Sequence, residues 1–366
     1  MARPSLVVVT GELSGFNYAK ELLPHLLPHF SVYGVFTEPV QGAKLLYDAK
    51  KLTAFGLFEA VTKLPQLISA KRKLLSFMEK ERPAALLLID FPGFNLSLAK
   101  GAKKLGIKVF YFIPPKLWAW GSWRVKRLKE RVDRLFLIFP FEEPFYRSYG
   151  LNAEFVGNPL VDMVKPELPQ GEFRERFGLE GPFFVLMPGS RNQEVYSLLP
   201  PMVEVAKRLK VNFVLPLAPT VDAQFVKEQV KRASPFIKVI PASYRYSALF
   251  YGECGVVASG TASLEAALAG LPHVVVYKLN PLTYYLAKRL VKVPFVSLPN
   301  LIAGKEVVPE LLQEAVDPDN LTDTFLTLQE NGEQVRRLLS AEVSSKLKGG
   351  AVKTLARRIR EELLGE

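Results

Sequence analysis

Short apolar runs alternate along this chain with longer segments of helical periodicity, and this alternation restricts the possible folds most strongly. The runs are rich in Val, Ile, Leu and Phe and lack polar alternation, as in strands that are buried on both faces of a parallel sheet. The helical segments between them then cover both faces. We therefore predict an α/β fold with two doubly wound domains. The expected strands span residues 6–10, 85–89, 108–113, 134–139, 183–187, 212–216, 238–240, 255–258 and 273–277.

The chain is long enough for two such domains, because 366 residues exceed the usual size of one domain, about 150 residues. Proline and glycine punctuate residues 159–181, which favours a linker there. We expect one domain over residues 1–165 and a second over residues 166–340. From residue 320 onward the pattern is helical without a strand signal, and residues 341–366 are expected to form a terminal helix.

The charge balance favours anionic partners, since 48 Lys and Arg residues against 36 Asp and Glu residues give a formal net charge of +12. Nucleic acid, phosphorylated ligands and acidic lipid surfaces all fit this charge. The single cysteine, Cys254, and three histidines without zinc-like spacing lead us to expect a reducing compartment and no metal site. No apolar run suits a signal peptide or approaches the roughly 18 to 20 residues that cross a bilayer, so any membrane contact is expected to be peripheral.

Two turns in the first half of the chain carry candidate site residues. The first expected strand runs into Gly11-Glu12-Leu13-Ser14-Gly15, where glycines let the backbone approach a ligand closely, although a tight turn capped by Ser14 explains the same residues. Asp90 follows a buried strand, at the edge of the sheet where α/β folds bind ligands. A carboxylate there is suited to accept a proton from a substrate hydroxyl, and the alternative is a cap on the next helix.

Two further turns lie in the second half. Residues 183–187 lead into Pro188-Gly189-Ser190-Arg191, which combines a helix start, a glycine, a hydroxyl and a guanidinium as in a phosphate cradle. Ser259-Gly260-Thr261 repeats the construction and adds Glu265, a carboxylate suited to accept hydrogen bonds from ribose hydroxyls. Capped helices with solvated polar side chains remain the alternative for both turns.

Two segments suit a lipid or another extended partner. Residues 52–80 place apolar side chains, Phe55 and Phe58 among them, beside Lys63, Lys71 and Arg72, as in an interfacial amphipathic segment or in an ordinary helix on a sheet. Residues 114–124 contain all three tryptophans and precede a basic stretch. This pattern suits sugar, lipid or nucleic-acid contact, and an aromatic core beside a solvated basic helix is the alternative.

Taken together, these segments resemble the lipid-A-disaccharide synthase family of glycosyltransferases, from about residue 9 to about residue 312 and in the family's order. The motifs that carry the resemblance are Gly11-Glu12-x-Ser14-Gly15, Ile89-Asp90-x-Pro92-x-Phe94-Asn95, Leu117-Trp118-Ala119-Trp120, Pro140-Phe141-Glu142, Pro188-Gly189-Ser190-Arg191-x-x-Glu194, Ser259-Gly260-Thr261-Ala262-x-Leu264-Glu265, and Leu286-Ala287-Lys288 through Ser297-Leu298-Pro299-Asn300-Leu301-Ile302-Ala303-Gly304.

The resemblance implies a GT-B glycosyltransferase fold, in which two Rossmann-like domains face each other across a cleft and a C-terminal helix packs back on the first domain or on a partner subunit. It also implies the reaction. UDP-2,3-diacylglucosamine donates its sugar, with inversion, to the 6-hydroxyl of 2,3-diacylglucosamine 1-phosphate. The products are the β-1,6-linked lipid A disaccharide 1-phosphate and UDP, in a Gram-negative bacterium.

The resemblance also assigns roles to residues. Asp90 is the general base, and Arg191 offsets the charge that develops on departing UDP. The chain departs from the family's usual residues at Phe16, Gly93, Asn158, Pro114 and Lys116, which implies a remodelled acceptor side. The residues implied for UDP are Ser190, Glu194, Ser259, Gly260, Thr261 and Glu265, and those implied for the sugar or acceptor are Gly11, Glu12, Ser14, Asn95 and Asn300.

The expected partners are the two acylated sugars and the inner face of the inner membrane, which the protein contacts peripherally from the cytoplasm. We expect no cofactor and no nucleic acid, and a homodimer is possible within the family. Two alternatives stay open from the sequence. One is another GT-B enzyme, such as a UDP-N-acetylglucosamine epimerase or a transferase with a different acceptor. The other is a non-catalytic protein that binds nucleic acid or acidic membranes through its basic, Trp-rich stretch.

Overall fold

The computed structural model describes residues 3–11, 13–52, 64–119, 121–280, 284 and 293–365. It divides into two compact units. The N-terminal unit contains Met1–Pro159 together with Lys348–Glu366, and the C-terminal unit contains Leu160–Leu347. The division falls after Pro159, earlier than the expected boundary after residue 165, and the expected linker contains two helices, α7 (Pro159–Met163) and α8 (Gln170–Phe177).

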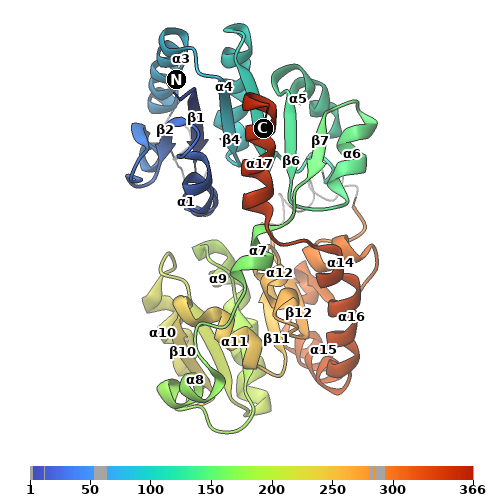
Figure 1. The fold of residues 1–366 in the computed structure, drawn as a ribbon. Helices are drawn as coiled ribbons and strands as arrows, with labels where there is room; N and C mark the ends of the chain where they lie inside the picture. The colour runs from blue at the N-terminus through green and yellow to red at the C-terminus, as the bar shows by residue number, and fades with distance from the viewer. Residues whose placement is uncertain are drawn as a thin grey trace. The chain divides into compact units, whose positions relative to one another are not determined.

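The N-terminal unit is a doubly wound parallel sheet. Its described strands lie in the order β3-β2-β1-β4-β5-β6-β7, so the chain winds outward from β1 in one direction and from β4 in the other. Figure 1 shows helices on both faces of this sheet. The elements are β1 (Ser5–Thr10), α1 (Leu13–Leu26), β2 (Ser31–Phe36), β3 (Lys44–Asp48), α3 (Leu64–Glu81), β4 (Ala85–Ile89), α4 (Pro92–Lys104), β5 (Lys108–Phe112), α5 (Val125–Arg131), β6 (Arg134–Leu137), α6 (Glu142–Ser148) and β7 (Ala153–Phe155).

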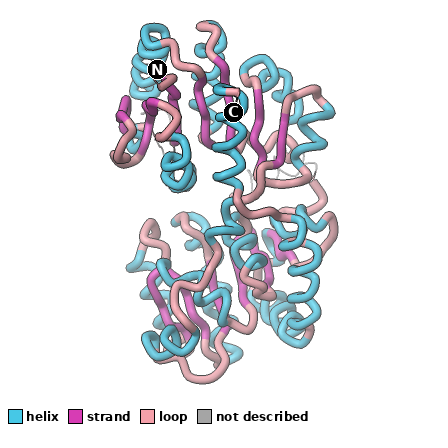
Figure 2. Tube along the Cα trace, viewed as in Figure 1, coloured by secondary structure: helices cyan, strands magenta, loops and turns pink. Residues whose placement is uncertain are grey.

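The C-terminal unit repeats this winding. Its described strands follow the order β10-β9-β8-β11-β12-β13, and all of their pairings are parallel. Figure 2 shows the strands of each unit, in magenta, between helices. The remaining elements are β8 (Phe184–Met187), α9 (Asn192–Leu209), β9 (Phe213–Leu217), α10 (Ala223–Lys231), β10 (Ile237–Pro241), α11 (Arg245–Tyr251), β11 (Gly255–Ala258), α12 (Thr261–Leu268), β12 (His273–Tyr277), α14 (Leu298–Ala303), β13 (Glu310–Leu312), α15 (Pro318–Glu330) and α16 (Gly332–Glu342).

The prediction of two doubly wound α/β units is confirmed, and all nine expected strands are present within a residue or two of their expected bounds. Four of the described strands were not expected: β2, β3, β7 and β13. Three of these, β3, β7 and β13, lie at sheet edges, and the last two have only three residues each. A strand at the edge of a sheet has one edge open to water, so it does not need a continuous apolar run. The sequence of such a strand therefore gives little indication that it is a strand.

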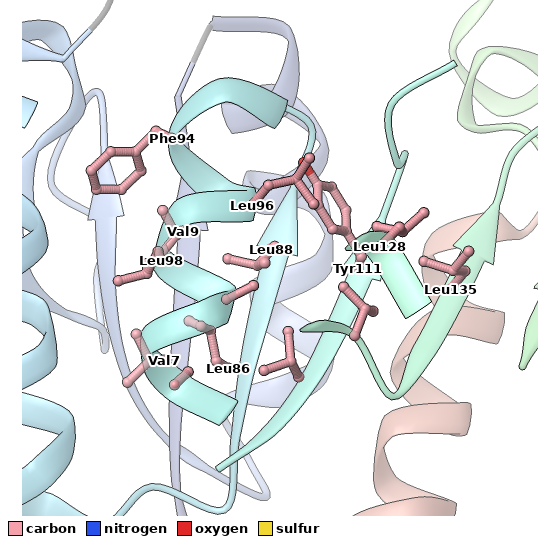
Figure 3. Close-up of a cluster of buried hydrophobic side chains, with 14 of the residues drawn as sticks. Val7, Val9, Leu86, Leu88, Phe94, Leu96, Leu98, Tyr111, Leu128 and Leu135 are labelled. Carbon is pink, nitrogen blue, oxygen red and sulfur yellow. The ribbon is translucent and has the colours of Figure 1, made fainter. Parts of the chain in front are cut away.

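The core of the N-terminal unit lies between the sheet and the helices that cover it. Leu86 and Leu88 of β4 are fully buried beneath α4, which contributes Leu96 and Leu98. Figure 3 shows these side chains together with those of β1 and β5. Burial of a leucine side chain stabilises the fold by about 1.5–3 kcal/mol, so this layer fixes the strand ends where the predicted site residues lie.

The terminal helix α17 (Ala351–Leu364), red in Figure 1, belongs to the N-terminal unit. It packs against α1, and an ion-pair network ties it to the sheet edge. Glu154 of β7 pairs with Arg134 at 2.5 Å and with Arg358 of α17 at 2.7 Å, and Arg134 also pairs with Glu362 at 2.6 Å. The end of the chain is helical, as expected, but the terminal helix begins at Ala351 rather than at the expected residue 341. Among the described helices, none has the length and apolar character required to cross a membrane.

Candidate functional site

Among the described strands, each unit has one topological switch point, where the chain reverses its direction of winding. In the N-terminal unit it lies between β1 and β4, whose carboxyl ends are paired at Thr10 and Ile89. In the C-terminal unit it lies between β8 and β11, which pair up to Met187 and Val257. Open α/β sheets bind ligands in the crevice at such points. The predicted catalytic and UDP residues follow these four strands, as do the predicted sugar residues apart from Asn300, which follows β12.

Asp90 lies in a strained turn at the end of β4. Asp90 and Phe91 both have a φ of 51°, a left-handed conformation that non-glycine residues rarely adopt. Hydrogen bonds hold the turn: the Asp90 carbonyl oxygen accepts from Asn95 Nδ2 at 2.7 Å and from the Tyr111 hydroxyl at 2.8 Å. The Asp90 amide donates to the Phe112 carbonyl at 3.0 Å. The half-buried Asp90 is thus placed by its backbone at the switch point.

Asn95 and Tyr111 support this turn. Asn95 is fully buried on α4, and its amide nitrogen points at the Asp90 carbonyl, so its observed contact is with the protein backbone. Tyr111 was not singled out from the sequence, because a tyrosine in an apolar strand has no distinguishing pattern. Burial raises the pKa of its phenol, and the negative charge of Asp90 raises it further, so Tyr111 remains a hydrogen-bond donor.

The turn after β1 lies beside Asp90. A Cβ atom on Gly11 would collide with the Phe91 ring, and one on Gly15 would lie 3.8 Å from the Asp90 Cβ. Glycine therefore allows α1 to start directly against the strained turn. Ser14 lies in the first turn of α1, and Glu12 lies outside the described residues. Phe16 is buried against Phe36 with ring centroids 6.2 Å apart, so this departure from the family pattern is a core residue.

A buried carboxyl group joins the loops after β5 and β6. Glu142, 2% exposed, accepts hydrogen bonds from Trp118 Nε1 at 2.9 Å and from the Phe139 amide at 3.2 Å. Desolvation raises its pKa from 4.5 to about 7, although these hydrogen bonds and the charge of Lys116 oppose the shift. Trp118 packs edge-on against Phe141, and the Tyr146 hydroxyl donates to the Pro115 carbonyl. Within the Trp-rich segment, Trp118 therefore packs against the hydrophobic core of the N-terminal unit.

The turn between β8 and α9 presents polar groups around a helix N-terminus. Ser190 and Arg191 are exposed, and Arg191 Nη1 lies 3.3 Å from Glu194 Oε1. Glu194 Oε2 accepts a hydrogen bond from the Ser190 amide at 3.3 Å. The Glu194 side chain lies against Gly189, which has a φ of 107° and where a Cβ atom would collide with Glu194. No side chain caps α9, so its first amides face the turn with the positive end of the helix dipole. Such an end suits a phosphate group.

The turn between β11 and α12 lies on the neighbouring strand and has the same character. Gly260 has a φ of 134° and a ψ of −150°, a region open essentially to glycine alone, and no side chain caps α12. Thr261 is exposed at the helix start, and Ser259 Oγ donates to the Val296 carbonyl at 3.4 Å. Glu265, one turn further on, is 8% exposed and pairs with Arg245 at 3.3 Å. All six residues expected for UDP therefore gather at one switch point.

Asn300 lies on α14 and is fully buried. Its Nδ2 donates to the Val308 carbonyl and to Glu310 Oε1, and its Oδ1 accepts from the Val307 and Val308 amides. Glu310 also accepts from Ser297 through its amide at 2.9 Å and its hydroxyl at 2.7 Å. The side chain of Asn300 is thus occupied by the protein, in a network that orders the 297–310 segment.

The predicted membrane residues are only partly described. Phe55, Phe58 and Lys63 lie outside the described residues. On α3, Lys71 Nζ donates to Ser97 Oγ at 2.7 Å, so its charge is directed toward α4, whereas Arg72 is exposed.

Comparison with known proteins identifies the family. Residues 6–359 match the family model described as lipid-A-disaccharide synthetase. The chain is 39% identical over 332 residues to the lipid-A-disaccharide synthase of Myxococcus xanthus, with 87% of this chain and 86% of that protein covered. It is 36% identical over 377 residues to the lipid-A-disaccharide synthase of Nitrosococcus oceani, with 99% and 97% covered.

Solved structures agree on the fold at low sequence identity. The UDP-N-acetylglucosamine 2-epimerase of Neisseria meningitidis, bound to UDP-N-acetylglucosamine, is similar with a TM-score of 0.69 and 15% identity, covering 99% of this chain and 100% of that one. The calicheamicin glycosyltransferase CalG4 has a TM-score of 0.64 and 14% identity, with 100% and 99% covered. These likenesses confirm the GT-B fold alone. The family match covers nearly the whole chain, and the chain belongs to the lipid-A-disaccharide synthetase family of glycosyltransferases.

Proposed function

We propose that this protein transfers 2,3-diacylglucosamine from UDP-2,3-diacylglucosamine to the 6-hydroxyl of 2,3-diacylglucosamine 1-phosphate, with inversion, and releases UDP. Family membership over residues 6–359 carries the proposal. The epimerase alternative is not favoured, because its likeness is limited to the fold. The position of Asp90 at one switch point, and of the six residues expected for UDP at the other, supports the assignment of acceptor and donor halves.

In this proposal the N-terminal unit binds the acceptor, and Asp90 takes the proton from its 6-hydroxyl as that oxygen attacks the anomeric carbon of the donor. The strained turn orients the Asp90 side chain, while Asn95 and Tyr111 hold its backbone. General-base catalysis of this kind contributes about 10²–10⁴-fold. We therefore assign Asn95 to positioning, and keep Gly11, Glu12 and Ser14 as candidate sugar contacts.

The C-terminal unit binds UDP in this proposal. Arg191 and the first amides of α9 and α12 stabilise the negative charge that grows on the diphosphate as the sugar leaves. Ser190, Ser259 and Thr261 supply hydroxyl groups, Gly260 lets the backbone approach, and Glu265 accepts hydrogen bonds from the ribose. Glu194 keeps the turn closed around Arg191, and Asn300 positions its own segment.

Asp90→Asn and Arg191→Ala test these roles, with product formation from both lipid substrates as the readout. Each change is expected to lower the rate at least about 100-fold. Asp48→Asn is the matched control for Asp90→Asn. Asp48 caps the helical turn at Ala49–Lys51, and asparagine caps helices equally well, so this variant makes the same chemical change outside the proposed site. Arg208→Ala is the control for the second, because Arg208 lies at the opposite end of α9 and pairs with the exposed Asp319. Full activity in Asp90→Asn would contradict the general-base role.

We also propose that the protein binds a membrane surface peripherally, since both proposed substrates carry acyl chains. Leu64, Ile68 and Arg72 follow one another at helical spacing on α3, and the two apolar side chains are 52% and 44% exposed. The opposite face, with Ala70 and Leu74, is buried on the sheet. An exposed apolar stripe that ends in a cation suits the boundary of a lipid layer. A homodimer remains a prediction, which light scattering on the purified protein tests.

A further inference from the structure

Glu265, the proposed ribose ligand, is held on one side by two neighbouring residues. Its Oε1 accepts a hydrogen bond from the Tyr246 hydroxyl at 3.1 Å and from Arg245 Nη2 at 3.3 Å. Its Oε2 has no hydrogen-bond partner among the residues that the structure describes. The buried carboxylate therefore has one oxygen committed to the protein and one available to a ligand.

Arg245 and Tyr246 form a preorganised pair. The Arg245 guanidinium carbon lies 4.2 Å from the centre of the Tyr246 ring, and Nη2 also donates to the Tyr246 hydroxyl at 2.7 Å. Burial raises the pKa of the Tyr246 phenol, and the charge of Glu265 adds to this effect. Tyr246 thus remains protonated and relays a donated hydrogen bond from Arg245 to Glu265. A positive charge beside the carboxylate offsets the cost of burying it.

The backbone beneath this pair is anchored as well. Glu167 accepts hydrogen bonds from the Tyr246 amide at 3.1 Å and the Ser247 amide at 2.7 Å. In return, the fully buried Ser247 hydroxyl accepts from the Glu167 amide at 2.9 Å and the Leu168 amide at 3.1 Å. This reciprocal capping resembles a capping box and fixes the start of α11, from which both side chains reach Glu265.

We propose that Arg245 and Tyr246 are positioning residues, which turn the Glu265 carboxylate so that Oε2 accepts hydrogen bonds from the ribose hydroxyls of the UDP donor. This inference rests on the proposed function and adds a determinant of nucleotide recognition to it. Because two donors converge on Oε1, the Glu265 side chain is held in one orientation and Oε2 stays unused before the ligand binds. A glutamate without such support would lose side-chain entropy on binding, which weakens the affinity.

The test is calorimetric titration of the full chain with UDP and with 2′,3′-dideoxy-UDP, which lacks both ribose hydroxyls. In the unmodified protein UDP binds more tightly than the dideoxy compound, and Glu265→Gln removes most of this preference. Tyr246→Phe and Arg245→Met are expected to reduce the preference about tenfold, because a hydrogen bond to a charged group is worth about that factor. Their affinity for the dideoxy compound stays unchanged. Tyr246→Phe combined with Glu265→Gln is expected to lose no further preference.

Tyr251→Phe is the matched control. It removes a hydroxyl from the same helix, one that donates to the Leu168 carbonyl at 2.7 Å rather than to Glu265, and is expected to keep the full preference for UDP. An unchanged preference in Tyr246→Phe and Arg245→Met would overturn the inference while leaving the proposed function in place. An equal loss of affinity for both nucleotides would overturn it as well, since that is the result of a merely structural role. Failure of the unmodified protein to bind UDP would overturn both.

Discussion

Replacing Glu142 by glutamine should change how the stability of the protein depends on pH. Glu142 is buried, and desolvation raises its pKa from 4.5 to about 7 in the folded state. The folded state therefore holds a proton that the unfolded state has released between these two pH values. Stability from this group is greatest at low pH and falls as pH rises toward 7, which is the reverse of the usual behaviour of a paired carboxylate.

The size of the effect follows from the two pKa values. Each tenfold change in proton affinity is worth about 1.4 kcal/mol, so the free energy of unfolding falls by about 3 kcal/mol between pH 4 and pH 8 through Glu142 alone. In Glu142→Gln this contribution disappears, because glutamine does not titrate. The variant is thus expected to gain about 3 kcal/mol relative to the unmodified protein over this range, whatever constant cost the new amide adds.

The free energy of unfolding is measured by urea titration at each pH, with tryptophan fluorescence as the signal. Trp118 is a suitable reporter because it donates a hydrogen bond to the Glu142 carboxyl group. Glu143→Gln is the matched control, because Glu143 is next in the chain, is half-exposed and is paired with Arg147 at 2.8 Å. A stability difference between Glu142→Gln and the unmodified protein that stays constant from pH 4 to pH 8 would refute the reasoning.

Three further changes have expected results. Burial lowers the pKa of His273 from 6.5 to about 4, so this group contributes stability that is present above pH 6.5 and is lost as pH falls toward 4. In His273→Asn the free energy of unfolding, measured with urea, should therefore fall by about 3 kcal/mol less between pH 6.5 and pH 4 than in the unmodified protein. An unchanged fall would contradict the buried neutral imidazole. Gly93→Ala should raise the free energy of unfolding by about 0.5–1 kcal/mol, because a Cβ there meets nothing within 4 Å on helix α4; a loss of stability in thermal unfolding would mean that the helix start needs glycine. Replacing Leu64 and Ile68 together by serine should weaken sedimentation with anionic vesicles, whereas Leu326→Ser, which alters a 41% exposed leucine of α15, should not; equal binding in both variants would remove α3 as the contact.

The fold was predictable to the extent that its central strands are continuous apolar runs. The strand before Asp90 reads Ala-Leu-Leu-Leu-Ile, and all five residues are buried because both sheet faces are covered. By contrast, β2 contains Tyr33 and Gly34 and is only partly buried, and β3 is an edge strand with charged ends and no buried residue, so neither has a long apolar run. The sheet order, which creates the two switch points, follows from pairings between distant strands that no local pattern encodes.

The site was predictable where glycine and polar residues follow a strand directly. Those patterns placed the turns at Asp90, Arg191 and Gly260 after buried strands, and the sheet order then places these turns at the two switch points. The supporting residues were not predictable, because Tyr111 and Arg245 act through neighbours that are distant along the chain. Burial also changes the meaning of residues that the motifs include: the polar atoms of Asn300 are occupied by backbone groups and Glu310, which a sequence does not reveal.

The most direct test of the proposed function is incubation of the purified protein with UDP-2,3-diacylglucosamine and 2,3-diacylglucosamine 1-phosphate in detergent, with UDP release and the lipid product followed by mass spectrometry. We predict a tetraacyl disaccharide 1-phosphate that appears together with UDP in equal amounts. Both signals should require the two lipid substrates and should be lost in Asp90→Asn and Arg191→Ala. UDP release without the acceptor lipid, or no disaccharide when both substrates are present, would contradict the proposed transferase reaction.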